Sequence, residues 1–118
     1  MNKRQAGREA EQLAAAYLES KGFFIVDQNY FFERSEVDIV AYDGSVVVFI
    51  EVKMRTTLAF GAPEESIDDK KIQSIQKAAE AWIYERRMDG YPVRFDVVSI
   101  FQKNNEAPEI KHLIDAFR

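Results

Sequence analysis

Apolar residues recur every three or four positions in two stretches of the chain, which is the spacing of amphipathic helices. The first stretch predicts a helix over residues 5–21, followed by Gly22, a residue type that favours a helix stop. The second predicts a long helix over residues 67–88, followed by Asp89 and Gly90. The apolar stripes consist of Ala6, Ala10, Leu13, Ala14, Tyr17 and Leu18 in the first helix and of Ile72, Ile75, Ala79, Trp82 and Ile83 in the second.

Runs of β-branched and aromatic residues fill most of the remaining sequence. They predict strands over residues 23–30, 36–42, 46–53 and 93–101. The third run is apolar on both faces up to Glu51, which is typical of a central, buried strand. Asp43-Gly44 is a strong turn signal between the second and third runs.

Two segments remain between and after these elements. Residues 54–66 are expected to form a loop whose length suggests a function. Residues 110–117 have helical spacing, although a strand beginning at Ile110 also fits. The order of helix, three strands, helix and strand predicts an α/β fold with a mixed sheet flanked by helices. We expect one domain over residues 1–118.

Composition narrows the protein class. Hydrophobic residues make up 47% of the chain and charged residues 31%, a globular balance. The absence of cysteine and the single His112 exclude disulfides, thiolate sites and histidine clusters. No apolar run approaches the roughly 20 residues of a membrane helix, and no secretory signal is visible, so we expect a cytoplasmic protein with no membrane partner. The net charge of −4 does not by itself suggest nucleic acid.

Charged residues inside the apolar strands are the strongest chemical signal. Glu51 and Lys53 end the most apolar strand and, two residues apart, share one face of it. A two-residue hairpin loop would place Glu36 opposite Glu51, with Asp38 as its diagonal neighbour. A four-residue loop would place Asp38 opposite Glu51 instead. Both registers keep these four side chains on one face.

Three carboxylates around one lysine need either raised pKa values or a cation. Oxygen ligands suit a hard divalent ion, Mg²⁺ or Mn²⁺. The chemistry that uses such a set is metal-assisted phosphodiester hydrolysis, in which a lysine orients water or stabilises the transition state. Glu11 would complete the site if the first helix packs on the sheet. The alternatives are a plain Glu51–Lys53 salt bridge and solvent-exposed Asp38 and Glu11 side chains.

With these residues, the chain resembles the YraN-like family of uncharacterised bacterial proteins. That family is similar to archaeal Holliday junction resolvases and to the wider PD-(D/E)xK nuclease superfamily. The resemblance covers almost the whole chain. It is carried by residues 11–18, 36–40, 48–55, 60–63, 71, 94–98 and 116–117.

The resemblance implies a restriction-endonuclease-like αβββαβ core and a metal-dependent endonuclease acting on DNA, with branched or damaged DNA as candidate substrates. It implies that Asp38 and Glu51 bind Mg²⁺ or Mn²⁺, with Glu11 and Glu36 as further ligands. Glu11, Asp38 and Glu51 are then catalytic together with Lys53. Resolvases of related fold work as dimers, which makes a homodimer one expected assembly.

Cations in and after the 54–66 loop are expected to contact DNA phosphates, with a solvent-exposed helix start as the alternative. They are Arg55, Lys70, Lys71 and Lys77. Two alternative hypotheses remain for the chain as a whole. One is a nucleic-acid-binding or partner-binding module that no longer cuts, and the other is an acidic scaffold. Among single residues, we expect a structural hydrogen-bonding role for Asp96, core packing rather than base stacking for Phe60, and a surface or tail position for His112.

Overall fold

The computed structural model describes residues 3–118, with side chains from Gly7 onward. Ala6 of the predicted stripe therefore lies outside the described side chains. The elements are α1 (Lys3–Ser20), β1 (Phe24–Phe32), β2 (Ser35–Asp43), β3 (Val46–Arg55), the 3-10 helix η1 (Pro63–Ser66), α2 (Asp69–Glu85), β4 (Val93–Phe101) and β5 (Glu109–Phe117). No helix in this part of the chain has the length and apolar character needed to cross a membrane.

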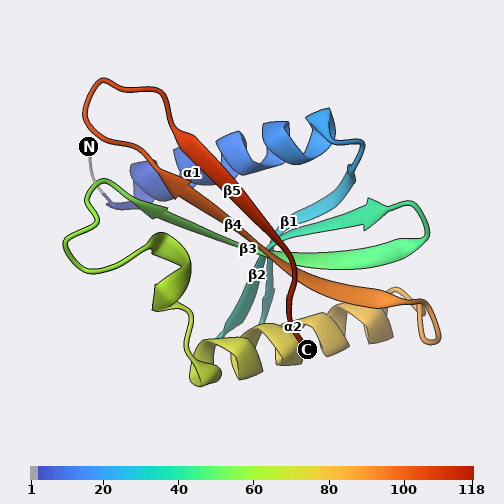
Figure 1. Cartoon of the computed structure of the whole chain (residues 1–118). Coiled ribbons are helices and arrows are strands. Elements are labelled where there is room, and N and C mark those ends of the chain that lie inside the picture. The colour runs from blue at the N-terminus through green and yellow to red at the C-terminus, as the bar shows by residue number, and fades with distance from the viewer. Residues whose placement is uncertain (1–2) are drawn as a thin grey trace.

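The five strands form one mixed sheet in the order β1-β2-β3-β4-β5. β3 and β4 are parallel because α2 carries the chain across between them, and the other neighbours are antiparallel. Helix α1 covers one face, over a cluster containing Leu18 and Ile50, and α2 covers the other, around Trp82 and Phe49. Figure 1 shows the sheet between the two helices. The predicted α/β class is confirmed.

The C-terminal segment is a strand, so the second of the two sequence interpretations is correct. β5 pairs with β4, from Glu109 opposite Phe101 to Phe117 opposite Phe95. The register shifts between Phe95 and Val97, and Asp115 on β5 has a φ of 55°. This irregularity breaks the alternation of apolar side chains along β5, which explains why the sequence pattern resembles that of a helix.

The second helix is shorter than predicted at both ends. It begins at Asp69 rather than at residue 67, because the Asp68 side chain caps it by accepting a hydrogen bond from the Lys71 N–H at 2.8 Å. It ends at Glu85 rather than at residue 88, since Arg87 adopts a left-handed φ of 54° that a helix cannot continue.

The β2–β3 hairpin sets the register of the acidic residues. Asp43 pairs with Val46, so the two-residue loop is Gly44-Ser45 rather than Asp43-Gly44. Gly44 supplies the positive φ of 61° that the turn needs. The ladder continues to Ile39–Ile50, and its next step sets Asp38 opposite Glu51. Asp38 opposite Glu51 is the second of the two predicted pairings, reached here by a two-residue loop shifted by one residue, and the pairing of Glu36 with Glu51 is wrong.

An irregularity in β1 lies beside Asp38. Gln28 pairs with Ile39 and Tyr30 with Val37, but Asn29, which would face Asp38, has a φ of 52° and is skipped. Asparagine tolerates this conformation better than most residues. The main-chain ladder between β2 and β3 also ends at this level, so the strands separate around Asp38.

Candidate metal centre

An open cavity of about 700 Å³ lies where β2 and β3 separate. Its walls come from α1, β2, β3, the following loop and the start of α2. It contains every predicted acid together with three of the predicted cations: Glu11, Glu36, Asp38, Glu51, Lys53, Arg55 and Lys71. Residues from separate segments of the first 71 positions therefore meet in one hollow. Its volume is in the range of small-molecule sites.

Asp38 is buried at the back of this cavity, with 8% of its surface exposed. Its Oδ2 atom accepts a hydrogen bond of 2.8 Å from the Val52 N–H, which ties β2 to β3 beyond their last main-chain pair. Burial and, after it, repulsion from Glu51 raise the pKa of Asp38 to about 8. At neutral pH, the metal-free carboxyl group therefore tends to hold its proton.

Glu51 is still less exposed, at 3%. Its Oε1 atom lies 3.7 Å from the Lys53 Nζ atom and 3.6 Å from the Lys71 Nζ atom. Its Oε2 atom is buried and has no hydrogen-bond partner. Burial raises the pKa of Glu51 despite the opposing effects of Lys71 and Lys53. Two lysines at salt-bridge distance thus compensate this carboxylate incompletely.

Glu11 and Glu36 form the outer part of the acidic wall, joined by Asn29. The Asn29 Nδ2 group donates a hydrogen bond to Glu11 Oε1 and a longer one, of 3.4 Å, to Glu36 Oε2. Burial raises the pKa of Glu11, although the Asn29 hydrogen bond opposes this effect. The sequence analysis missed Asn29. The run of three polar residues that ends at Asn29, in the middle of the predicted strand, is the signal that could have indicated it.

The donor set fits a hard divalent cation. Asp38 and Glu51 offer carboxylate oxygens, and one of these oxygens is buried without a partner. Among residues 7–118, no three acidic or histidine side chains are arranged as a complete metal site. Mg²⁺ commonly needs only one or two carboxylates, because it retains several waters. The inner pair can therefore hold such an ion, with Glu11 and Glu36 reaching it through water.

The remaining predicted cations separate into two groups. Lys70 lies in a hollow shared with Lys53 and Lys71, continuous with the acidic cavity. Lys71, which also lines the cavity, forms an ion pair with Glu51 that the sequence analysis did not anticipate. Lys77 does not line the cavity. Its Nζ atom is 2.6 Å from Glu33 Oε2.

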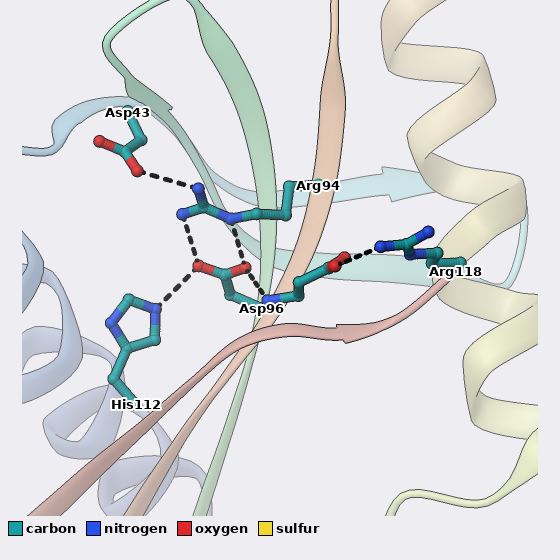
Figure 2. Close-up of polar contacts among 6 residues, drawn as sticks. Asp43, Arg94, Asp96, His112 and Arg118 are labelled. Carbon is teal, nitrogen blue, oxygen red and sulfur yellow. Dashed lines mark hydrogen bonds and ion pairs between the residues drawn. The ribbon is translucent and has the colours of Figure 1, made fainter.

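A second buried acid, Asp96, provides an informative contrast (Figure 2). Its carboxylate accepts hydrogen bonds from Arg94 Nε and Nη2 at 2.8 and 2.9 Å, from His112 Nε2 at 2.8 Å and from the Asp115 N–H at 2.9 Å. Burial opposes ionisation, but these bonds outweigh it and lower the pKa of Asp96. Arg94 also reaches Asp43 at 2.9 Å. Asp96 thus has the expected structural role, whereas Glu51 has one buried oxygen, Oε2, that accepts no hydrogen bond.

His112 is not a surface or tail residue. Only 6% of its side chain is exposed. Its ring lies edge-on to Tyr17 and Phe23, with centroids 5.8 and 5.6 Å away. The prediction was wrong because the partner of His112, Asp96, comes close only through the β4–β5 pairing.

Known proteins similar to this chain share one description. Residues 10–100 match the sequence model of a family described as "Uncharacterised protein family UPF0102". A UPF0102 protein of Geotalea uraniireducens is 41% identical over 111 residues, which cover 94% of this chain and 87% of the relative. One from Natranaerobius thermophilus is 40% identical over 119 residues, covering 99% and 100%. A third, from Geobacter sulfurreducens, is 43% identical over 111 residues, covering 94% and 87%.

Proposed function

The chain belongs to the uncharacterised protein family UPF0102, in line with its resemblance to YraN-like proteins, and on this premise we propose that it is a divalent-metal-dependent endonuclease that hydrolyses DNA phosphodiester bonds. The proposed substrates are branched or damaged DNA, and the proposed assembly is a homodimer. The observation that carries the proposal is the buried Asp38–Glu51 pair, with its unpartnered Glu51 Oε2 atom.

Asp38 and Glu51 would hold Mg²⁺ or Mn²⁺ between β2 and β3. The bound ion would supply Lewis acidity, lowering the pKa of a coordinated water and offsetting negative charge on the phosphate. Asp38 keeps one oxygen on the Val52 N–H at 2.8 Å and, while it holds its proton, hydrogen-bonds with Glu51, so a bound ion would take the place of that proton between the two carboxyl groups. This main-chain bond fixes the orientation of the carboxylate, which is the service that a supporting hydrogen bond gives to a metal ligand.

Lys53 is the candidate for acting on the reacting phosphate. Its Nζ atom lies 3.7 Å from Glu51 Oε1, beyond hydrogen-bond distance, and its side chain is 27% exposed to the cavity. It can therefore reach both the carboxylate and a phosphate oxygen. As water attacks phosphorus and the P–O bond to the leaving group breaks, the ammonium group would stabilise the growing negative charge. Arg55, Lys70 and Lys71 would hold neighbouring phosphates.

The direct test is cleavage by the purified full chain. A Holliday junction, a flap and a linear duplex of matched sequence are incubated with Mg²⁺, with Mn²⁺ or with EDTA, and Mn²⁺ binding is measured by calorimetry. We expect a metal signal and products that disappear with EDTA. Salt-sensitive DNA binding without a metal signal or products would support a non-cutting binding module instead. No salt-sensitive DNA binding at all would contradict a nucleic-acid function.

Asn29 is expected to position the outer acids. The Asn29→Gly variant keeps the left-handed backbone accessible but removes the amide that links Glu11 and Glu36. We expect Mn²⁺ affinity to fall about tenfold, the scale of supporting-ligand losses, with little change in Tm. Calorimetry and thermal unfolding measure the two quantities.

The Asn29→Ala variant separates the effect of the left-handed backbone on stability from the effect of the amide group on metal affinity. It loses the same hydrogen bonds and in addition strains the φ of 52°, at a cost of about 1–2 kcal/mol. The two variants should therefore have equal metal affinities and different stabilities. Wild-type Mn²⁺ affinity in Asn29→Gly would show that the amide does not position the acids.

A further inference from the structure

The loop between β3 and η1 presents two apolar side chains to solvent. Phe60 is 89% exposed and Leu58 is 55% exposed. The expectation that Phe60 packs in the core is therefore wrong. Burying a phenylalanine side chain is worth about 1.5–3 kcal/mol relative to leaving it in water. Because the fold forgoes that stabilisation at Phe60, this side chain is a candidate for binding.

Hydrogen bonds hold this loop in one shape. The Gly61 N–H donates to the Leu58 carbonyl at 3.1 Å, and the Ala62 N–H donates to Glu65 Oε2 at 3.1 Å. Gly61 has a φ of 94°, a backbone conformation that residues with a Cβ atom rarely adopt. The turn thus favours glycine directly after Phe60, and the two hydrogen bonds fix the backbone that carries the aromatic ring.

The loop leaves directly from the wall of the acidic cavity. Arg55, Thr56 and Thr57 line the cavity, and Leu58 and Phe60 follow them in the chain. In Figure 1 the loop projects from the end of β3, on the side of the molecule where α1 begins. A strand of DNA that runs from phosphate contacts at Lys53, Arg55 and Lys71 along this loop would bring its bases to Phe60.

We propose that Phe60 stacks on an unpaired nucleobase next to the phosphate held in the cavity, so that the chain selects DNA with unstacked bases at a branch, flap or gap. This inference rests on the proposed function. Inside an intact duplex, neighbouring bases cover both faces of each base, and exposing a face costs several kcal/mol. An aromatic side chain stacks on any base that is already exposed.

A nucleobase fits this surface better than a protein partner does. Stable protein interfaces bury about 1,200–2,000 Å² in total. Between residues 56 and 62 the large apolar side chains are Leu58 and Phe60, separated by Ala59, and Leu58 also lines a hollow with Phe101 and Ile110. An exposed aromatic ring on a loop that continues from a wall containing Lys53 and Arg55 is the combination found in single-strand binding grooves.

The test measures binding without cleavage. Full-length protein in Ca²⁺ buffer is titrated into a duplex with a short single-stranded flap and into a blunt duplex of the same sequence. A 2-aminopurine at the first unpaired position reports stacking by its fluorescence. We expect Phe60→Ala to weaken flap binding about tenfold and to remove the fluorescence change, with duplex binding within about twofold of wild type. Phe60→Trp should keep both signals.

Tyr84→Ala is the matched control, since Tyr84 is 79% exposed on α2 and lines no part of the cavity. It should bind like wild type. If wild type binds the flap and Phe60→Ala binds it equally well, the stacking inference fails while the proposed function stands. If wild type binds neither DNA, the proposed function fails as well. Dissociation of a dimer into monomers by Phe60→Ala in sedimentation would make the loop a contact between copies and overturn the inference.

Discussion

Replacing Glu51 with Gln is expected to lower metal-dependent DNA cleavage about a thousandfold and to make the metal-free protein more stable. A thousandfold loss corresponds to about 4 kcal/mol of transition-state stabilisation, which is within what a bound metal supplies. The gain in stability has a separate cause. The Glu51 carboxylate is 3% exposed and has an unpartnered oxygen, so an uncharged amide of the same shape removes a buried charge. Tm should rise by a few degrees.

The two changes together exclude simple misfolding, because a misfolded variant would lose both activity and stability. Glu80→Gln is the matched control, since Glu80 is exposed on α2. It should leave both the cleavage rate and Tm unchanged. Lys53→Ala should also lose most cleavage, but it should retain Mn²⁺ binding by calorimetry. Wild-type cleavage in Glu51→Gln would remove Glu51 from the proposed metal centre.

How much of this site could be predicted depends on the range of the interactions. Glu51 and Lys53 interrupt an apolar strand, so their unusual environment is visible in the sequence itself. The hairpin brings Asp38 opposite Glu51 through local pairing, and only its register had to be chosen. The helix residue Glu11 reaches the same cavity because the first apolar stripe packs on the sheet, as expected.

The features that were missed depend on strand irregularities and distant contacts. Asn29 contacts Glu11 and Glu36 because a left-handed residue interrupts β1, and the polar run in this strand marks the place but not the contacts with α1 and β2. His112 is buried because β5 pairs with β4, whereas the apolar spacing of this segment is also that of a helix. In both cases tertiary pairing decided between local patterns of equal weight.

The distribution of acids also explains how a chain of net charge −4 can be proposed to bind DNA. Asp96 and Asp43 share the single positive charge of Arg94, and neither of them lines the cavity. In the cavity, Lys53 and Lys71 compensate the charge of the inner acids, Asp38 and Glu51, only in part. A divalent ion would offset their charge, and Lys53, Arg55 and Lys71 would then form the rim. Binding should therefore be weak on plain duplex DNA and fall steeply with salt.

Asp38 should make the metal-free protein more stable toward acidic pH, and Mn²⁺ should reverse this trend. The folded pKa of Asp38 is about 8, against an ordinary value of 3.8. Between these values the folded state binds more protons than the unfolded state. The contribution of Asp38 to the free energy of unfolding is complete below about pH 4 and is lost as the pH rises through about 8. Burial of Glu51 acts in the same direction.

Thermal unfolding between pH 5 and pH 8 measures this effect with little interference from the structural acids. The pKa values of Asp96 and Glu64 are lowered, that of Glu64 to about 2, so their stabilisation is lost only in more acidic solution. We expect the metal-free Tm to fall from pH 5 to pH 8. In Asp38→Asn this slope should be flatter, because the amide can still accept the Val52 N–H but cannot titrate. The exposed control Asp89→Asn should keep the wild-type slope.

Metal binding must displace the proton that Asp38 tends to hold near neutral pH, so the stabilising effect of the metal should grow with pH. At a Mn²⁺ concentration 100 times Kd, the stabilisation is about 2.7 kcal/mol, or about 10 °C in Tm for a domain of this size. The shift should be largest near pH 8, small near pH 5 and absent in Asp38→Asn. An equal shift at both pH values, or the same shift in Asp38→Asn, would mean that Mn²⁺ binds elsewhere, because an ion held by Asp38 must compete with a proton whose pKa is about 8.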